Sequence, residues 1–109
     1  MNKAYLLTGG NIGNREETLE KANILIRQHC GHITALSSLY ETAAWGKTDQ
    51  AAFLNQALEL MTLLAPGVLM EQLLEIEQTA GRQRLEKYGP RTIDIDILFL
   101  ITISYLRPC

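Results

Sequence analysis

The chain has little of what marks a secreted or membrane-bound protein. No apolar run in its 109 residues approaches the ~20 needed to span a bilayer. The N-terminus enters an apolar, strand-like stretch without a signal-peptide pattern. Two cysteines, Cys30 and Cys109, supply neither a disulfide framework nor a metal-ligand spacing. We therefore expect a cytoplasmic protein with reduced thiols and no membrane partner, in which Cys30 is a small apolar residue at a helix end.

An excess of basic residues is also lacking. The chain has 10 Lys and Arg against 12 Asp and Glu, for a net charge of -2. Proteins that bind nucleic acids usually carry surplus positive charge, so we expect no nucleic-acid partner. The sequence shows no internal repeat, low-complexity segment or linker. With 47% hydrophobic residues, its length allows one domain with a real core but not two.

Hydrophobic periodicity indicates strands and helices in alternation. Short apolar or alternating runs predict strands over residues 4–8, 33–40 and 53–60, and a fourth strand that begins at Thr92. Helical spacing predicts one helix from an Asn14 N-cap to Gly31, with Glu17 completing a capping box, and another from Pro66 to Gly81. The order is βαββαβ, which is the ferredoxin-like pattern. We expect an α+β sandwich with an antiparallel sheet and both helices on one face.

Two segments allow more than one interpretation. Residues 9–13, with three glycines, lack the Gly-Lys-Ser/Thr ending of a phosphate-binding loop, so we interpret them as a tight strand-to-helix turn. In the third strand, Phe53 and Asn55 share a face and could hold a heterocycle by stacking and by amide hydrogen bonds. The alternative is a core Phe53 with an exposed Asn55. The leucines at 54, 58 and 60 are expected to need a bulge or burial on both faces.

The strand beginning at Thr92 carries two carboxylates on one face. Asp94 and Asp96 point the same way as Thr92, while Ile93, Ile95 and Ile97 point the other way. Like charges on one face repel unless a cation intervenes, and Mg²⁺ prefers such oxygen ligands together with substrate phosphates. For an isolated Asp-x-Asp, a solvated face with salt bridges to nearby arginines is the more common explanation. The cationic side chains just upstream are Arg82, Arg84, Lys87 and Arg91.

The surrounding residues favour the functional alternative. Gly-Pro-Arg-Thr-Ile-Asp-Ile-Asp-Ile-Leu, residues 89–98, closely resembles the signature of the 6-hydroxymethyl-7,8-dihydropterin pyrophosphokinase family of folate synthesis. The resemblance runs through residues 4–100 and implies Mg²⁺-dependent transfer of pyrophosphate from ATP to the pterin, with AMP released. We divide the chain into a family core, 1–100, and an atypical tail, 101–109. Because the family continues further, we expect a C-terminally truncated member that self-associates through the surface exposed by truncation.

The resemblance also implies individual roles. Asp94 and Asp96 would bind two Mg²⁺ ions, and Arg82 and Arg91 would steady the transferring group. The residues implied to contact ATP are Glu77, Arg84, Lys87, Tyr88 and Ile97. The residues implied to hold the pterin are Thr42, Ala43, Trp45, Phe53 and Asn55.

Three alternatives stay open from the residues alone. Glu77 could instead form a helix salt bridge to Arg82 or Arg84. The chain could be a ferredoxin-like module that binds nucleotide and pterin without turnover. It could also be a metal-dependent nuclease that uses the same aspartates, although the charge balance counts against this.

Overall fold

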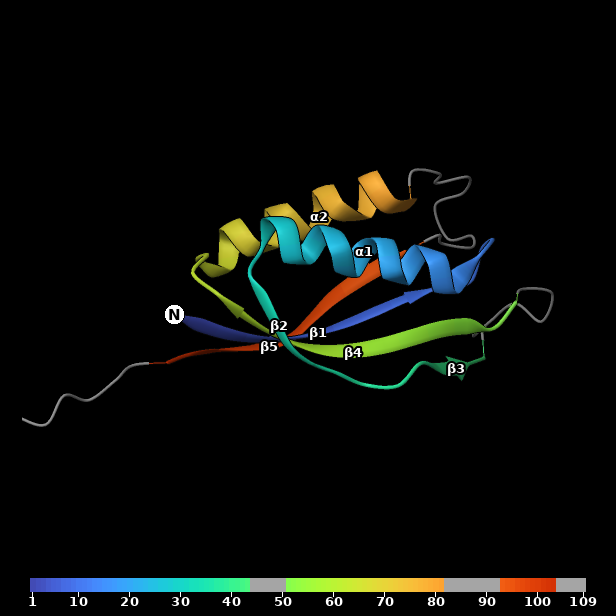
Figure 1. Ribbon diagram of the computed structural model, residues 1–109, viewed down its shortest axis with the longest axis horizontal. Helices are drawn as coiled ribbons and strands as arrows, with labels where there is room; N and C mark the ends of the chain where they lie inside the picture. The colour runs from blue at the N-terminus through green and yellow to red at the C-terminus, as the bar shows by residue number, and fades with distance from the viewer. Residues whose placement is uncertain (44–50, 82–92, 104–109) are drawn as a thin grey trace, which may run out of the picture.

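The computed structural model describes residues 1–43, 51–81 and 93–103. Both helices lie side by side over one face of an antiparallel sheet (Figure 1). The expected α+β, ferredoxin-like arrangement is therefore confirmed. Its elements are β1 (Asn2–Gly10), α1 (Arg15–His29), β2 (His32–Leu36), β3 (Tyr40–Thr42), β4 (Phe53–Thr62), α2 (Pro66–Gly81) and β5 (Asp94–Thr102). Within these described residues, neither helix is long and apolar enough to cross a membrane.

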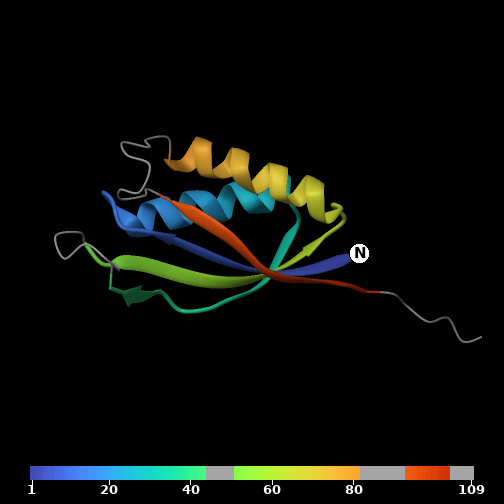
Figure 2. The ribbon, with the colours of Figure 1, turned by 180° about the vertical axis from the view of Figure 1, so that it is seen from behind.

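The sheet has the strand order β2-β4-β1-β5, with β3 paired to β4 beside this path. β1 pairs with β4 from Asn2↔Thr62 to Gly10↔Leu54 without a register shift. β5 lies at one edge of the sheet, the edge nearest the viewer in Figure 2. β1 therefore has a strand on each side. Residues of β4 and β5 that pair with the same β1 residue lie on the same face of the sheet.

The strand expected over residues 33–40 is instead two short strands. β2 ends at Leu36 and β3 begins at Tyr40. Ser37 explains the interruption, because its Oγ accepts the hydrogen bond from Ala57 N at 2.9 Å in place of a backbone carbonyl. The side chain thereby ends the regular ladder, and β3 resumes pairing further along β4.

The core lies between the helices and the sheet. Its largest fully buried apolar side chains are Leu6, Leu19, Ile26, Leu60, Leu69 and Leu73. Leu54, Leu58 and Leu60 all belong to it, on one face of a strand with no register shift against β1. The expectation of a bulge or two-sided burial was wrong, since even-numbered residues of a regular strand share a face.

A polar residue within this apolar row obscured the pattern. Gln56 lies on the helix-facing side of β4, between Leu54 and Leu58, and its Oε1 accepts a hydrogen bond from Asn23 Nδ2 of α1 at 3.0 Å. Gln56 Nε2 donates to Ser37 O at 2.9 Å. The carboxamide is satisfied inside the fold, so the polar residue leaves the strand regular.

Both ends of α1 are fixed by side chains. Asn14 Oδ1 accepts from Glu17 N at 3.1 Å, which confirms the predicted N-cap. The Glu17 side chain accepts from Asn14 Nδ2 at 3.2 Å, and not from the backbone N–H that a capping box would use. At the other end Cys30 is buried, as expected, and Thr62 Oγ1 donates to its carbonyl oxygen. Gly31 follows with φ 154°, and a Cβ there would collide with the backbone of Met61.

β5 contains a bulge. Ile97 pairs with Leu6 and Phe99 pairs with Tyr5, so Leu98 is an extra residue between two consecutive pairs. Up to Ile97 the predicted alternation is confirmed for the described residues, with Ile93 and Ile95 buried in the core and Asp96 exposed. After the bulge, Phe99 lies on the face away from the helices, its ring centroid 4.5 Å from that of Tyr5.

Candidate functional site

The face of the sheet away from the helices brings together residues of β4 and β5. Gly9 of β1 pairs with Asn55 on one side and with Asp94 on the other. We call these three residues the Gly9 rung. Adjacent strands lie about 4.8 Å apart, so Asn55 and Asp94 stand roughly two strand spacings from each other. Because glycine has no side chain, nothing from β1 itself fills the space between them.

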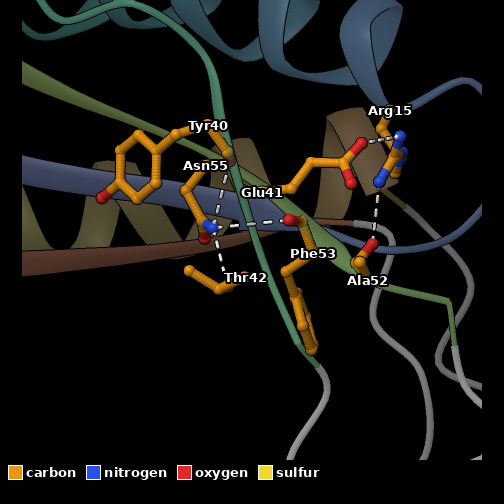
Figure 3. Close-up of polar contacts among 7 residues, drawn as sticks. All are labelled: Arg15, Tyr40, Glu41, Thr42, Ala52, Phe53 and Asn55. Atoms are coloured by element: carbon orange, nitrogen blue, oxygen red, sulfur yellow. Dashed lines mark hydrogen bonds and ion pairs between the residues drawn. The ribbon is translucent and has the colours of Figure 1, made fainter.

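Asn55 is a buried and anchored amide. Its side chain is 8% exposed, and Nδ2 donates to Thr42 Oγ1 at 2.9 Å and to Tyr40 O at 3.4 Å (Figure 3). Oδ1 lies over Gly9, where a Cβ would approach it to 2.6 Å. The alternative of an exposed Asn55 is therefore wrong, and the alternative of a core Phe53 is wrong too, because Phe53 is only partly buried. β3 supplies these two acceptors, and a third, Phe53 O of β4, lies 3.5 Å from Nδ2.

The glycine-rich turn after β1 contacts neighbouring backbone. Gly13 has φ 67°, which is the left-handed conformation that favours glycine, so the predicted tight turn is confirmed from Asn11 onward. Gly9 and Gly10, which were predicted to belong to the turn, are instead the last residues of β1. Asn11 Nδ2 donates to Ala51 O at 3.1 Å. Arg15 donates to Ala52 O and forms an ion pair with Glu41 of β3. The turn thus fixes the entry to β4.

Arg15 and Glu41 were not among the residues predicted to matter. Their pairing spans 26 positions, so it leaves no periodic signal in the sequence. The available hint was a basic residue in the first turn of a helix, where negative charge is preferred.

A third carboxylate lies beside Asp94 and Asp96. Glu77 of α2 accepts a hydrogen bond from Ile95 N, with Oε2 at 2.6 Å, and so covers part of the open edge of β5. Burial raises the pKa of Glu77, and the neighbouring charges of Asp94 and Asp96 raise it further, while the hydrogen bond from Ile95 lowers it. Glu77 therefore lies next to both predicted metal ligands.

The donor set fits a hard cation that also binds substrate. Within the described ranges, no three His, Cys, Asp or Glu side chains form a group that could hold a metal ion by themselves. Two carboxylates on one strand face would supply only part of an octahedral oxygen shell. Water and phosphate oxygens would have to complete it, as is usual for Mg²⁺ bound together with a nucleotide.

The other predicted site residues fall into two groups. Thr42 is placed against Asn55, Ala43 directly follows β3, and the Ile97 side chain packs toward the core, on the opposite face from the carboxylates. The second group lies outside the described residues and consists of Trp45, Arg82, Arg84, Lys87, Tyr88 and Arg91. The possible salt bridge from Glu77 to Arg82 or Arg84 lies outside them as well.

The fold and this face define a ferredoxin-like α+β protein with an anchored amide and a carboxylate pair on its open sheet face. Residues 5–106 match the family described as 7,8-dihydro-6-hydroxymethylpterin-pyrophosphokinase (HPPK). The chain belongs to this family, so the resemblance seen in the sequence is confirmed.

Curated relatives include two bacterial pyrophosphokinases and a plant bifunctional protein. The chain is 48% identical over 98 residues to a 2-amino-4-hydroxy-6-hydroxymethyldihydropteridine pyrophosphokinase of Bacillus subtilis, covering 89% of this chain and 59% of the relative. It is 43% identical to the enzyme of that name from Methylorubrum extorquens, covering 90% and 63%. A mitochondrial folate synthesis bifunctional protein of Pisum sativum is 46% identical, with 89% and 19% covered. The chain thus spans about three-fifths of the length of these two bacterial relatives.

Solved structures agree on the fold. A crystal structure of wild-type Plasmodium falciparum HPPK-DHPS with pteroate has a TM-score of 0.73 at 20% identity, and the match covers 91% of this chain and 30% of that one. The structure of the same wild-type protein with STZ-DHP gives 0.74. At this identity the likeness concerns the fold alone.

Proposed function

We propose that the chain transfers pyrophosphate from ATP to the hydroxymethyl group of 6-hydroxymethyl-7,8-dihydropterin, in folate biosynthesis. The observation that carries this proposal is the Gly9 rung. Asn55, an anchored amide suited to a heterocycle edge, lies on one side of Gly9. Asp94, a carboxylate suited to a metal–phosphate complex, lies on the other side. A ring held at Asn55 would project its substituent toward Asp94. Family membership over residues 5–106 supports the same assignment.

On the pterin side, we propose that Asn55 is the specificity-determining group. Its Oδ1 offers an acceptor to the ring edge, while the N–H groups of Nδ2 donate to Thr42 and Tyr40 and so hold the amide in one orientation. Phe53, on the same face of β4 and partly exposed, would stack on the ring. Thr42, Ala43 and Trp45 complete the proposed pocket.

On the nucleotide side, Asp94 and Asp96 would hold two Mg²⁺ ions, which neutralise phosphate charge when bound. Arg82 and Arg91 are proposed to steady the transferring group, and ATP contacts are proposed for Glu77, Arg84, Lys87, Tyr88 and Ile97. In the reaction the hydroxymethyl oxygen bonds to the β-phosphorus, the bond from that phosphorus to the α–β bridging oxygen breaks, and AMP leaves. The hydroxyl proton is lost to solvent. The protein contributes mainly alignment and charge stabilisation.

A second candidate is a binding module without turnover. It is favoured by one observation, namely that the described residues carry the groups proposed to bind ligands, Asn55, Asp94 and Asp96, whereas the arginines proposed to steady the transferring group lie outside them.

The deciding experiment measures AMP formed from MgATP with and without reduced pterin, alongside thermal shifts with MgATP, pterin and DNA. Pterin-dependent AMP formation supports the transferase. Stabilisation by both small ligands without AMP supports the binding module. Stabilisation by DNA alone would reject both and favour a nuclease.

A further inference from the structure

Arg15 joins two strands to the first helix. From the first position of α1, its Nη1 donates to Ala52 O at 2.9 Å, and its Nη2 meets Glu41 Oε1 at 2.9 Å (Figure 3). Ala52 directly precedes β4, and Glu41 is the middle residue of β3. One guanidinium therefore holds the start of β4 and the centre of β3 at a fixed separation.

The helix itself does not require an arginine at this position. The N-terminal end of a helix carries partial positive charge, so a cation there is unfavourable. The first turn of α1 is otherwise acidic, with Glu16 and Glu17, and Asn14 already caps it. The contacts to β3 and β4, rather than helix stability, account for the placement of Arg15.

β3 has few other attachments. It is three residues long, all three are exposed, and among the described strands it pairs only with β4. Yet β3 supplies the two shorter hydrogen bonds of the Asn55 amide, to Thr42 Oγ1 and Tyr40 O, beside a longer one to Phe53 O of β4 at 3.5 Å. The orientation of a buried amide thus depends on a short, exposed strand, and Arg15 fastens that strand to the helical layer.

We propose that Arg15 is a positioning residue for the Asn55 amide. By bridging Glu41 and the Ala52 carbonyl, it keeps β3 seated on β4, so that Thr42 and Tyr40 hold Asn55 in the orientation a pterin edge would meet. The ligand named here rests on the proposed function, whereas the contact between strands does not.

The shape of the guanidinium is essential to this role. The Arg15 and Glu41 side chains are 29% and 58% exposed, and an exposed ion pair alone contributes little. Arg15 acts through two separate acceptors, which a planar fork can reach together and a single ammonium cannot. Arg15→Lys should therefore behave like Arg15→Gln, although it keeps the charge.

The first test needs no ligand. Amide hydrogen exchange is measured on the full 109-residue chain for the original sequence, Arg15→Lys, Arg15→Gln and the control Arg27→Gln, which removes an exposed arginine from the same helix. We expect exchange at residues 40–42 and 53–55 to accelerate roughly two- to tenfold in both Arg15 variants, with residues 58–61 unchanged. Unchanged exchange at β3, or an equal increase throughout the sheet, would overturn the proposal.

The second test separates positioning from mere stability. Titration calorimetry should show weaker binding of 6-hydroxymethylpterin, by a similar factor, in both Arg15 variants, with MgATP affinity unaltered and Arg27→Gln indistinguishable from the original chain. Glu41→Gln combined with Arg15→Gln should add little to the single change. Faster exchange with unaltered pterin affinity would reject the positioning role. If the original chain binds no pterin, the proposed function fails, and the exchange data still decide whether Arg15 holds β3.

Discussion

Gly9 and Asn55 face each other across β1 and β4, and the Asn55 carboxamide occupies the space that a side chain at Gly9 would need. A Cβ on Gly9 would lie 2.6 Å from Asn55 Oδ1. The amide cannot simply swing away, because its Nδ2 is bonded to Thr42 and Tyr40. One missing side chain thus sets the position of the proposed pterin anchor.

Gly9→Ala should therefore displace the Asn55 amide. We expect the free energy of unfolding to fall by about 1–3 kcal/mol from overpacking and pterin affinity to fall about tenfold or more. Urea unfolding and calorimetry measure the two effects. Gly67→Ala is the matched control, because its Cβ would meet nothing within 4 Å and it lies in the first turn of α2, so it should be neutral or slightly stabilising. Equal effects of the two changes would disprove the steric account.

Asp94→Asn and Asp96→Asn should each weaken MgATP binding, by about tenfold or more, because each removes a charged oxygen that we propose as a metal ligand. The fold should persist, since loss of one like charge relieves repulsion among Glu77, Asp94 and Asp96. Calorimetry with MgATP, and with ATP in chelator, measures the Mg²⁺-dependent part. Glu75→Gln, an exposed carboxylate on α2, serves as control and should change nothing. Undiminished affinity in both Asp variants would remove the metal assignment.

Glu77→Gln and Glu77→Leu should differ in stability. Glutamine keeps an acceptor for Ile95 N–H and removes a charge beside two aspartates, so the free energy of unfolding should stay level or rise slightly. Leucine leaves the Ile95 amide without this acceptor and should lower the free energy of unfolding by about 1–3 kcal/mol. Thermal unfolding should show a drop of roughly 4 °C or more for the leucine variant alone. Identical melting of both variants would show that the hydrogen bond contributes nothing.

Cys30 should be unreactive while the protein is folded. Burial raises the pKa of its thiol to about 11, so little thiolate exists at neutral pH. In a Cys109→Ser background, alkylation by iodoacetamide should be slow in buffer and fast in urea. Since the thiol ionises more readily in the unfolded chain, its contribution to stability is complete below the ordinary pKa near 9.0 and declines as pH rises toward about 11. Cys30→Ala should lack this decline; a similar alkaline loss in Cys30→Ala would assign it to other groups.

The second half of β5 should promote self-association. Leu98, Phe99 and Ile101 are 53%, 54% and 48% exposed on an edge strand. We expect an apparent mass that grows with protein concentration in light scattering, and Leu98→Lys should reduce it without disturbing a strand pair. Met70→Lys places the same charge on an exposed apolar site of α2, outside β5, and should have little effect. A strictly monomeric chain, or equal responses to the two lysines, would contradict this surface.

Features that depend on neighbouring residues could be predicted from the sequence, whereas those that depend on distant side chains could not. The Asn14 cap, the two helices and the separation of Asp94 from Ile95 follow from local spacing. The break after β2 does not, because it arises where Ser37 replaces a backbone acceptor for Ala57, 20 positions away.

The candidate site divides in the same way. The chemistry of the side chains at Asn55, Asp94 and Asp96 is enough to suggest a heterocycle and a metal ion as ligands. Their relation through Gly9 requires the pairing of three strands, and the support from Arg15 requires a contact across 26 positions. Neither contact leaves a periodic pattern in the sequence, because the residues involved are far apart along the chain.

The extra residue in β5 makes the strand unusually tolerant at one point. Because Ile97 and Phe99 already pair with consecutive residues of β1, deleting Leu98 would leave every other side chain facing as it does now and would only straighten the strand. Deleting Asp96 or Leu100 instead would turn part of the strand to the opposite face. The two halves of β5 are thus independent in register. A one-residue change of length at position 98 would not alter which face Asp94 and Asp96 occupy.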